Sequence, residues 1–233
     1  MGGPCYVEGH GTPDVTDNFH LQRFVLNGVE FFCVEQAFQA MKFKDPSHQE
    51  TVSKLRPEEG PKRAAFGRQC FRAGNARLPS FRTEWDGIKA EVMYRASRAK
   101  FMQNSDSASK LADTGEAAIT RPDDPDGFWA LWNCYIMKRI RIELKPPAKR
   151  SETETKLLEM IESKFDLQAS IFQGEDTINS SEFNVCCPRL PYAHEGGTSG
   201  GVAPTSEKTQ LKEGKPSVAK QKAETSCCNC SIL

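Results

Sequence analysis

Early in the chain, a β-prone pattern of hydrophobic and polar residues is followed by a helical one. Residues 23–32 contain two β-prone stretches on either side of Asn27-Gly28. Asn and Gly tolerate the positive φ angles that a tight two-residue turn requires. The sequence therefore predicts a β-hairpin over this segment.

The hydrophobic spacing becomes helical directly after the hairpin. Val34, Phe38 and Met41 recur at i, i+4 and i+7, and Ala37 lies beside them. Such a spacing places these side chains on one face of a helix. We therefore expect a helix over residues 34–43 that buries this apolar stripe.

Four further helices are expected before residue 145. One covers Glu84 to Phe101, follows Thr83, and has Asp86 three residues on as a capping-box-like partner. Its buried side is expected to hold Ile88, Val92 and Ala99. The other three are expected near residues 58–70, 105–113 and 131–144. Residues 5–145 are thus predicted to form one compact, helix-rich α+β domain with a small β-hairpin near its N-terminus.

Two prolines, Pro146 and Pro147, end this domain, because neither can donate a backbone hydrogen bond. Beyond them, Ser151 and Glu154 have capping-box spacing at the start of an amphipathic helix. The apolar residues of this helix are Leu157, Leu158, Ile161 and Phe165. The helix could bind a partner, but packing on the core is the expectation that we favour. Residues 146–185 are therefore predicted to form an accessory helical segment.

Residues 186–233 are predicted to be a disordered tail. From Glu195 to Ser226 the composition is dominated by Gly, Ser, Thr, Lys, Glu and Pro. Such a segment cannot bury enough apolar surface to offset its conformational entropy. We expect it to act as a flexible tether.

Charge is unevenly distributed along a chain whose formal net charge is zero. Basic residues exceed acidic ones by 2 through Lys145, fall short by 5 from there through Glu207, and exceed them by 3 in the remainder. The overall balance argues against a nucleic-acid or membrane-surface binder that uses the whole chain. No stretch approaches the roughly 18 apolar residues of a membrane span, and the first residues lack a signal peptide's pattern. We therefore expect a protein that is made and kept in the cytosol.

The chain has nine cysteines, and they do not supply the two CxxC pairs of a zinc site. A disulfide framework is also unexpected in a cytosolic protein. We therefore expect no zinc site, and we expect the protein to act without any metal or organic cofactor.

The last four residues, Cys230-Ser231-Ile232-Leu233, fit the C-a-a-X pattern of a prenylated cysteine. One prenyl chain anchors weakly, so palmitoylation of Cys227 and Cys228 and the lysines before them would supply a second signal. A chance cysteine-rich segment is the alternative. The expected partners are then a prenyltransferase and a membrane. The expected location is the cytoplasmic face of that membrane, with a cytosolic pool.

Three polar residues adjoin the apolar stripe of the helix at 34–43. Glu35, Gln39 and Lys42 lie within about 60° of one another around the helix axis. By spacing alone, a solvated helix face with i, i+4 contacts is the more common outcome. The alternative is a carboxylate, an amide and an amine that share the edge of a buried face.

The residues around these three resemble a known family. Glu35-Gln36-Ala37-Phe38-Gln39-Ala40-Met41-Lys42-Phe43 is similar to the Glu-His-x-x-Gln-Ala-x-Lys-Phe helix of the NADAR family, also called YbiA-like. Further family-like elements follow in the same order over about 130 residues, Asp14 to Leu144. They are Asn18-Phe19, Ala64-Ala65 with Gly67-Arg68, Trp85, Lys89, Met93, Lys100-Phe101, Gln103-Asn104, Leu111, Thr114-Gly115 and Asp126-Gly127-Phe128-Trp129.

The resemblance implies an N-glycosidase that acts on a nucleotide-like substrate. Some family members cleave phosphorylated riboflavin-pathway intermediates, and others act in ADP-ribose metabolism, including removal of ADP-ribose from guanine bases. The implied ligand is a nucleotide or ADP-ribose-type molecule, or ADP-ribosylated nucleic acid. Breaking a C1′–N bond develops positive charge on the ribose, which a nearby carboxylate stabilises.

The resemblance also implies which residues carry the reaction. Glu35 is the first candidate carboxylate and Asp126 the second, one as electrostatic stabiliser or base and the other to activate water. Lys42 could pair with a phosphate, or attack C1′ as a neutral amine if burial lowers its pKa. Gln39 is grouped with the substrate-binding residues.

Aromatic and cationic side chains complete the implied substrate site. Trp85 and Trp129 match family positions suited to stack on the departing base, although Trp85 could instead be a hydrophobic anchor. Trp132 has no such match and is expected in the core. Arg68 and Asn18 could hold phosphate or ribose oxygens, and a salt-bridged Arg68 is the alternative.

Three departures from the family pattern favour a second hypothesis. Gln36 stands where the family usually has His, and Thr120 stands near a common Val-Glu pair. After Trp129 a glycine-rich loop is missing, and such a loop lets the backbone approach a ligand closely. The alternative function is therefore a catalytically inactive ADP-ribose-binding module anchored at a membrane.

Overall fold

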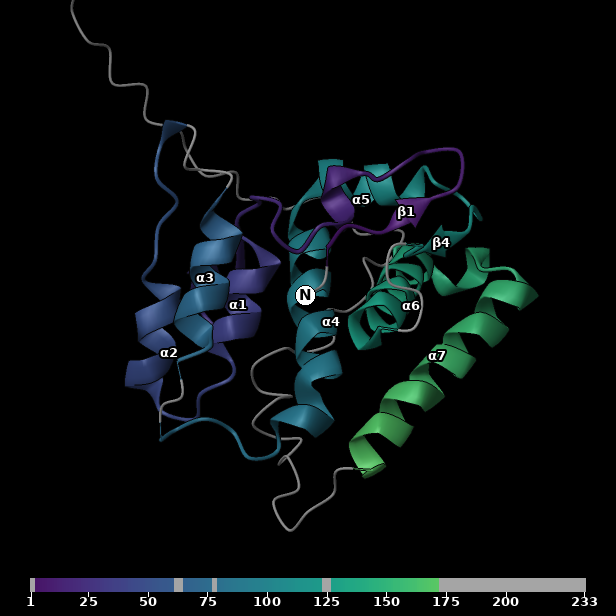
Figure 1. The fold of residues 1–233 in the computed structure, drawn as a ribbon. Helices are drawn as coiled ribbons and strands as arrows, with labels where there is room; N and C mark the ends of the chain where they lie inside the picture. Colours follow the sequence, from purple (N-terminus) through teal and green to yellow (C-terminus); the bar gives the residue numbers. More distant parts are fainter. Residues whose placement is uncertain (1–2, 61–64, 77–78, 123–126, 172–233) are drawn as a thin grey trace, which may run out of the picture. The chain divides into compact units, whose positions relative to one another are not determined.

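A computed structural model describes residues 3–60, 65–76, 79–122 and 127–171 (Figure 1). None of the helices in these ranges is long and apolar enough to span a membrane. In chain order the elements are β1 (Tyr6–Val7), η1 (Asp14–Thr16), β2 (Phe24–Leu26), β3 (Val29–Phe31), α1 (Val34–Ala40), α2 (Pro46–Ser53), α3 (Phe66–Gly74), α4 (Trp85–Gln103), α5 (Ser105–Ala112), β4 (Ile119–Thr120), α6 (Phe128–Glu143), η3 (Pro147–Lys149) and α7 (Glu152–Ile171).

The fold is helix-rich α+β, and the predicted hairpin is confirmed. Strands β2 and β3 pair antiparallel with Leu26 opposite Val29. Asn27 and Gly28 at the turn have φ angles of 55° and 75°, as a two-residue turn between twisted strands requires. A second pair that was not predicted joins β1 to β4, with Val7 opposite Ile119.

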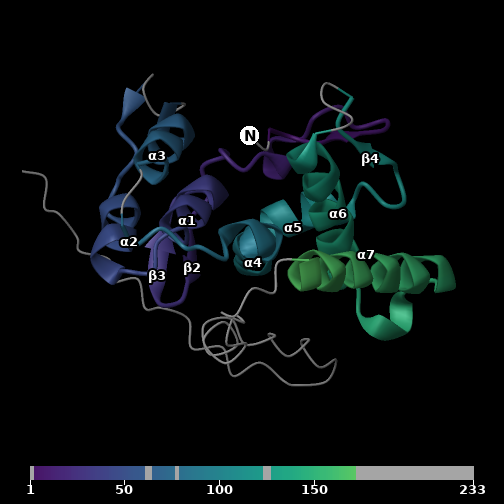
Figure 2. The same ribbon diagram turned by 60° about the horizontal axis from the view of Figure 1, so that its bottom comes forward.

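Helix α4 lies between α1 on one side and α6 on the other (Figures 1 and 2). The prediction that Thr83 and Asp86 cap its start is wrong. The cap residue is Glu84 without a side-chain cap bond, and Asp86 instead accepts a hydrogen bond of 2.7 Å from Nζ of Lys89. Ile88 and Val92 are buried as expected, whereas Ala99 is only partly buried.

Helix α2 was not predicted, although the sequence contains its start signal. The carboxylate of Asp45 accepts a hydrogen bond of 2.8 Å from the backbone N–H of Ser47, and Pro46 occupies the first helical position. The helix expected near 58–70 begins only at Phe66, as α3. Helices α5 and α6 correspond to the segments expected near 105–113 and 131–144.

Helix α7 packs on α4 and α6, as favoured from its pattern (Figure 2). Its capping box forms, since Glu154 N–H donates to Oγ of Ser151 at 3.1 Å and Ser151 N–H donates to the Glu154 carboxylate at 2.9 Å. The ring of Phe165 lies 4.7 Å from that of Trp132. Trp132 is therefore a core residue, as expected.

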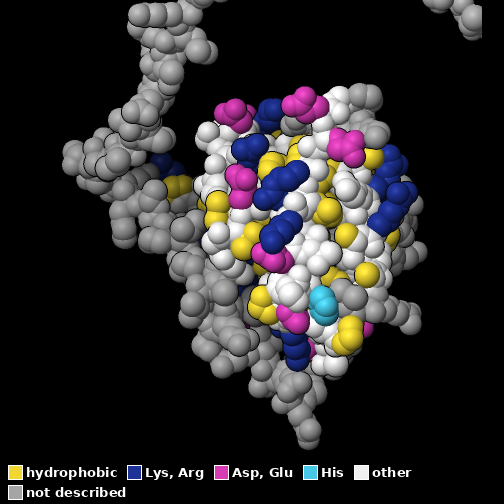
Figure 3. Space-filling view, turned by 90° about the vertical axis from the view of Figure 1, so that its left-hand side faces the viewer, with side chains coloured by type: hydrophobic (Ala, Val, Ile, Leu, Met, Phe, Trp, Pro, Cys, Tyr) yellow, Lys and Arg dark blue, Asp and Glu magenta, His cyan; other side chains and the backbone are white. Residues whose placement is uncertain are grey.

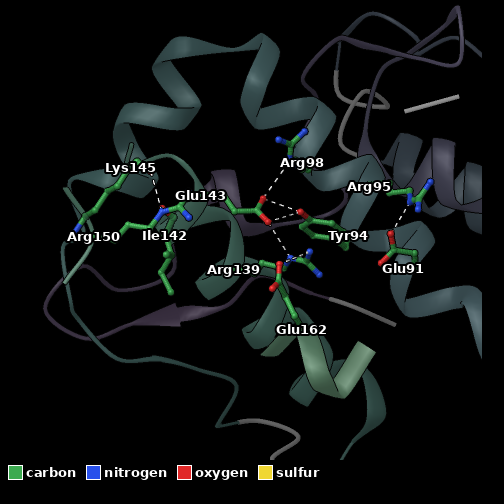
Figure 4. Close-up of polar contacts among 10 residues, drawn as sticks. All are labelled: Glu91, Tyr94, Arg95, Arg98, Arg139, Ile142, Glu143, Lys145, Arg150 and Glu162. Atoms are coloured by element: carbon green, nitrogen blue, oxygen red, sulfur yellow. Dashed lines mark hydrogen bonds and ion pairs between the residues drawn. The ribbon is translucent and has the colours of Figure 1, made fainter. Parts of the chain in front are cut away.

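A buried ionic cluster lies where α7 meets the domain (Figure 4). The carboxylate of Glu143 accepts hydrogen bonds from the Tyr94 hydroxyl at 2.6 Å and from Nε of Arg98 at 3.1 Å and of Arg139 at 3.0 Å. Arg139 also donates to Glu162 of α7 at 3.1 Å. Burial and the Glu143 charge raise the pKa of Tyr94. The buried carboxylate is thus fully paired, and the cluster joins α4, α6 and α7.

Candidate active site

The three polar residues of α1 and its end are buried rather than solvated. Glu35, Gln39 and Lys42 are 2%, 1% and 7% exposed, because α2, α3 and α4 all pack against this short helix. The expectation of a solvated helix face is therefore wrong. A carboxylate, an amide and an amine instead adjoin one another inside the domain.

The amide of Gln39 orients the carboxyl group of Glu35. Nε2 of Gln39 donates a hydrogen bond of 2.6 Å to Oε1 of Glu35. Helix α3 holds Gln39 in place, since a Cβ atom added to Gly74 would lie 2.5 Å from Cβ of Gln39. The other amide atom, Oε1 of Gln39, has no partner within the described part of the chain.

Burial shifts the protonation of both Glu35 and Lys42 toward the neutral forms. Desolvation raises the pKa of Glu35, against the opposing effects of the Gln39 hydrogen bond and the Lys42 charge. Desolvation lowers the pKa of Lys42, and Glu35 opposes this. Nζ of Lys42 donates to Oδ1 of Asn75 at 3.1 Å. A raised carboxyl pKa and a lowered amine pKa side by side suit acid–base or nucleophilic chemistry.

Two asparagines connect Glu35 to helix α6. The backbone carbonyl of Asn18 accepts a hydrogen bond of 3.0 Å from the N–H of Glu35. The side chain of Asn18 donates to Oδ1 of Asn133 at 3.4 Å. Both asparagines are 1% exposed. No local pattern in the sequence points to Asn133, because only the packing of α6 brings it to Asn18.

A second carboxyl that was missed lies near Glu35. The charge of Asp17 contributes to the raised pKa of Glu35, and burial raises the pKa of Asp17 itself. Fully buried Lys100 donates to the carbonyl of Val15 at 2.6 Å, and desolvation lowers its pKa to about 8. Asp17 directly precedes the Asn18-Phe19 motif, so its position in the sequence was the available signal.

The rings of both predicted stacking residues lie next to that of Phe38. Its ring centroid is 4.9 Å from that of Trp85 and 5.2 Å from that of Trp129. Trp85 is buried, which favours the hydrophobic anchor, whereas Trp129 is only partly buried. Trp129 is therefore the better placed of the two to contact a ligand.

Among the remaining predicted site residues, the structure describes only Arg68. Arg68 is exposed on α3 and forms no ion pair within the described ranges, so the salt-bridged alternative gains no support there. Asp126 lies outside the described residues, as do Cys227, Cys228 and Cys230. The roles predicted for these residues stay predictions.

Gln36, one of the departures from the family pattern, has a structural role. Its side chain accepts from the N–H of Phe32 at 2.9 Å and donates to the carbonyls of Leu55 at 3.0 Å and Val52 at 3.1 Å. These bonds tie the end of the hairpin to the end of α2. The Gln36 side chain thus hydrogen-bonds to backbone groups of neighbouring segments and not to Glu35. Thr120 is exposed in β4.

The described residues contain no candidate metal centre, and the face that includes α2 and α3 has no broad cationic surface. Among the described residues, no group of three His, Cys, Asp or Glu side chains could hold a metal ion. On the face that includes α2 and α3, Lys and Arg side chains are interleaved with Asp and Glu (Figure 3). This mixed charge does not favour broad contact with a phosphate backbone on that face.

Comparison with known proteins places this site within a family. The NADAR domain model matches residues 9–135, a range that contains Asn18, Glu35, Gln39, Lys42 and Asn133. The chain belongs to the NADAR family. The match ends within α6, so α7 lies beyond it.

Two curated relatives show where this NADAR chain is similar to known proteins. It is 30% identical to N-glycosidase YbiA of Escherichia coli over 112 residues, which is 48% of this chain and 64% of that protein. It is 32% identical to a riboflavin biosynthesis protein of Vibrio vulnificus over 133 residues, 55% of this chain and 33% of that protein. The chain therefore spans less than two thirds of either relative. The NMR structure of E. coli YbiA aligns with a TM-score of 0.45 at 26% identity, over 56% of this chain and 77% of that one.

Proposed function

We propose that this NADAR chain is an N-glycosidase that hydrolyses a ribose–base bond in an ADP-ribose-type or related nucleotide. The observation that carries the proposal is the buried Glu35–Gln39 pair beside Lys42. The name of the E. coli relative as an N-glycosidase supports the reaction class.

The proposed reaction uses Glu35 at the reacting carbon. When the C1′–N bond breaks, its electron pair leaves with the base, and positive charge develops on the ribose. The carboxylate of Glu35, aligned by Gln39, stabilises that charge. Water then bonds to C1′ and gives up one proton, while the departing base takes up a proton. Lys42, with its lowered pKa, binds the substrate's phosphate or assists at C1′ as an amine.

The rival function is an inactive ADP-ribose-binding module. Its support is the short connection after Trp129, where the family has a glycine-rich loop. The replacement of the family's His by Gln36 is a weaker argument for the binding module. Gln36 binds backbone groups at the end of α2 instead of facing Glu35.

A substrate panel separates these functions. The full chain is incubated with ADP-ribosylated guanine nucleic acid, with NAD, and with the phosphorylated riboflavin intermediates, and released base or amine is quantified. Release from at least one substrate supports the enzyme. Saturable ADP-ribose binding in calorimetry without release from any substrate supports the binding module.

We further propose that the protein is tethered to the cytoplasmic face of a membrane. The support is the cluster Cys227, Cys228 and Cys230 after a lysine-containing segment. Cys230→Ser should move a tagged protein from the membrane fraction to the cytosol. Unchanged fractionation would exclude prenylation of Cys230 as the anchor.

A further inference from the structure

Most of the unpaired buried polar atoms belong to residues that hydrogen bonds link to Glu35. Four buried side-chain polar atoms lack a hydrogen-bond partner within the described ranges, and three of them are Oδ1 of Asn18, Nδ2 of Asn133 and Oε1 of Gln39. The fourth is Oγ of Ser97 on α4. Buried polar atoms are almost always hydrogen-bonded, and an unpaired one costs about 1–3 kcal/mol. Three such atoms in one connected set indicate a ligand that completes them.

The two asparagines offer one acceptor and one donor. Nδ2 of Asn18 already binds Oδ1 of Asn133, so Oδ1 of Asn18 is free to accept and Nδ2 of Asn133 is free to donate. If the O and N atoms of both asparagine amides are interchanged, the pair still has one free donor and one free acceptor. The conclusion therefore does not depend on how the amides are oriented.

A hydroxyl group matches this pair, because it donates one hydrogen bond and accepts others. An ionised phosphate offers acceptors only and would leave the acceptor of the pair unfilled. The pair is also linked to the residue that carries the candidate catalytic carboxylate, since the backbone carbonyl of Asn18 accepts the backbone N–H of Glu35 at 3.0 Å. The ribose hydroxyl next to C1′ is the 2′-hydroxyl.

We propose that Asn133, together with Asn18, binds the substrate's 2′-hydroxyl and makes the site select ribose over 2′-deoxyribose. This inference rests on the proposed N-glycosidase function and names the specificity of that same site. Hydrogen bonds to this hydroxyl can strengthen as the oxocarbenium-like transition state forms. A site built for a hydroxyl rejects the analogue that lacks it, because its buried polar groups stay unpaired.

The proposed preference for ribose is opposite to the intrinsic reactivity of the two substrates. The electron-withdrawing 2′-hydroxyl makes the N-glycosidic bond of a ribonucleoside harder to break than that of its 2′-deoxy counterpart. Faster cleavage of the ribose form must therefore come from the protein.

The test compares the ribose, 2′-deoxy and 3′-deoxy forms of the substrate that the panel identifies, with kcat/KM for base release as the readout. The wild-type chain should prefer the ribose form over the 2′-deoxy form by about 10²-fold or more. The 3′-deoxy form should show a smaller decrease in kcat/KM than the 2′-deoxy form. Equal rates for the ribose and 2′-deoxy forms would overturn the inference while leaving the proposed function intact.

Substitutions in α6 test whether Asn133 causes the preference for the ribose form. Asn133→Ala should lower the rate on the ribose form and bring the ribose to 2′-deoxy ratio close to one. Asn133→Ser, which keeps a hydroxyl donor, should retain part of the preference. Leu131→Ala on the same helix removes a side chain that is 49% exposed and should leave the ratio unchanged. A preference that survives in Asn133→Ala, or a changed preference among bases instead, would contradict the assignment.

Calorimetry keeps the inference testable if no substrate is cleaved. The probes are ADP-ribose and its analogue that lacks the 2′-hydroxyl of the terminal ribose. Tighter binding of ADP-ribose, lost in Asn133→Ala, supports the hydroxyl site even where the enzyme proposal fails. Equal binding of the two probes, or binding of neither, would overturn it.

Discussion

The side-chain amide of Gln39 donates a 2.6 Å hydrogen bond to the carboxyl group of Glu35, one helical turn earlier. This contact fixes one oxygen of a buried carboxyl group and leaves the other available to a ligand. It depends on helix α3, because Gly74 is the residue that lets Gln39 fit beside Glu35. The reactive geometry is therefore set by helix packing as well as by the sequence of α1.

Gly74→Ala should impair catalysis through Gln39. The added methyl group would lie 2.1 Å from Oε1 and 2.5 Å from Cβ of Gln39, so Gln39 must move away from Glu35. A displacement of about 1 Å in a catalytic group can lower the rate about 10²-fold. Arg72→Ala, an exposed change on the same helix, is the control. Steady-state base release checks this, and unaltered kcat/KM in Gly74→Ala would show that the contact does not position Glu35.

Glu35→Gln should gain stability relative to wild type as pH rises. Because burial raises the pKa of Glu35 above 4.5, the folded state holds its proton more tightly than the unfolded chain does. That contribution is fully present below the unfolded pKa and is lost as pH rises through the folded pKa. The neutral amide has no such dependence.

Urea unfolding of both proteins from about pH 4 to about pH 7 measures this difference. The free energy of unfolding of Glu35→Gln minus that of wild type should increase with pH across this range. A difference that is constant or decreases would mean that the Glu35 pKa is not raised in the folded protein.

Gln36→His should cost stability without restoring a catalytic partner. The Gln36 side chain accepts one backbone N–H and donates to carbonyls in the last turn of α2 and just after it, and an imidazole cannot satisfy all of these groups. We expect a loss of about 1–3 kcal/mol in the free energy of unfolding. Base release should change less than about tenfold in kcat/KM. A large gain in activity would show that His at this position acts on Glu35.

Phe165→Ala should destabilise the domain although it lies outside the family match. The Phe165 ring packs 4.7 Å from Trp132 and 5.6 Å from Tyr94, and removing a buried aromatic ring costs about 3–5 kcal/mol. Leu167→Ala, whose side chain is 60% exposed, should change stability by less than about 0.5 kcal/mol. Equal effects of the two changes in thermal unfolding would show that α7 is not part of the folded core.

Local chemistry accounts for the features that the sequence predicted. Asn27-Gly28 fixes its turn by backbone preference, and Ser151 with Glu154 caps α7 through bonds within four residues. The apolar stripe of α1 follows from helical spacing. These signals need no knowledge of the rest of the chain.

The errors and omissions arise from partners far along the chain or from local competition. Asp86 does not cap α4 and instead accepts a hydrogen bond from Lys89. The burial of Glu35 depends on three helices that follow it, and Asn133 joins Asn18 across 115 positions. Spacing along one helix cannot reveal such contacts.

The central claim is that Glu35 stabilises the charge that forms when a ribose–base bond breaks. The most direct measurement is the initial rate of base release by wild type and by Glu35→Gln, with Glu50→Gln, an exposed change on α2, as the control. Glu35→Gln should lower kcat by about 10²-fold or more and Glu50→Gln should not. Release by Glu35→Gln at the wild-type rate would contradict the account.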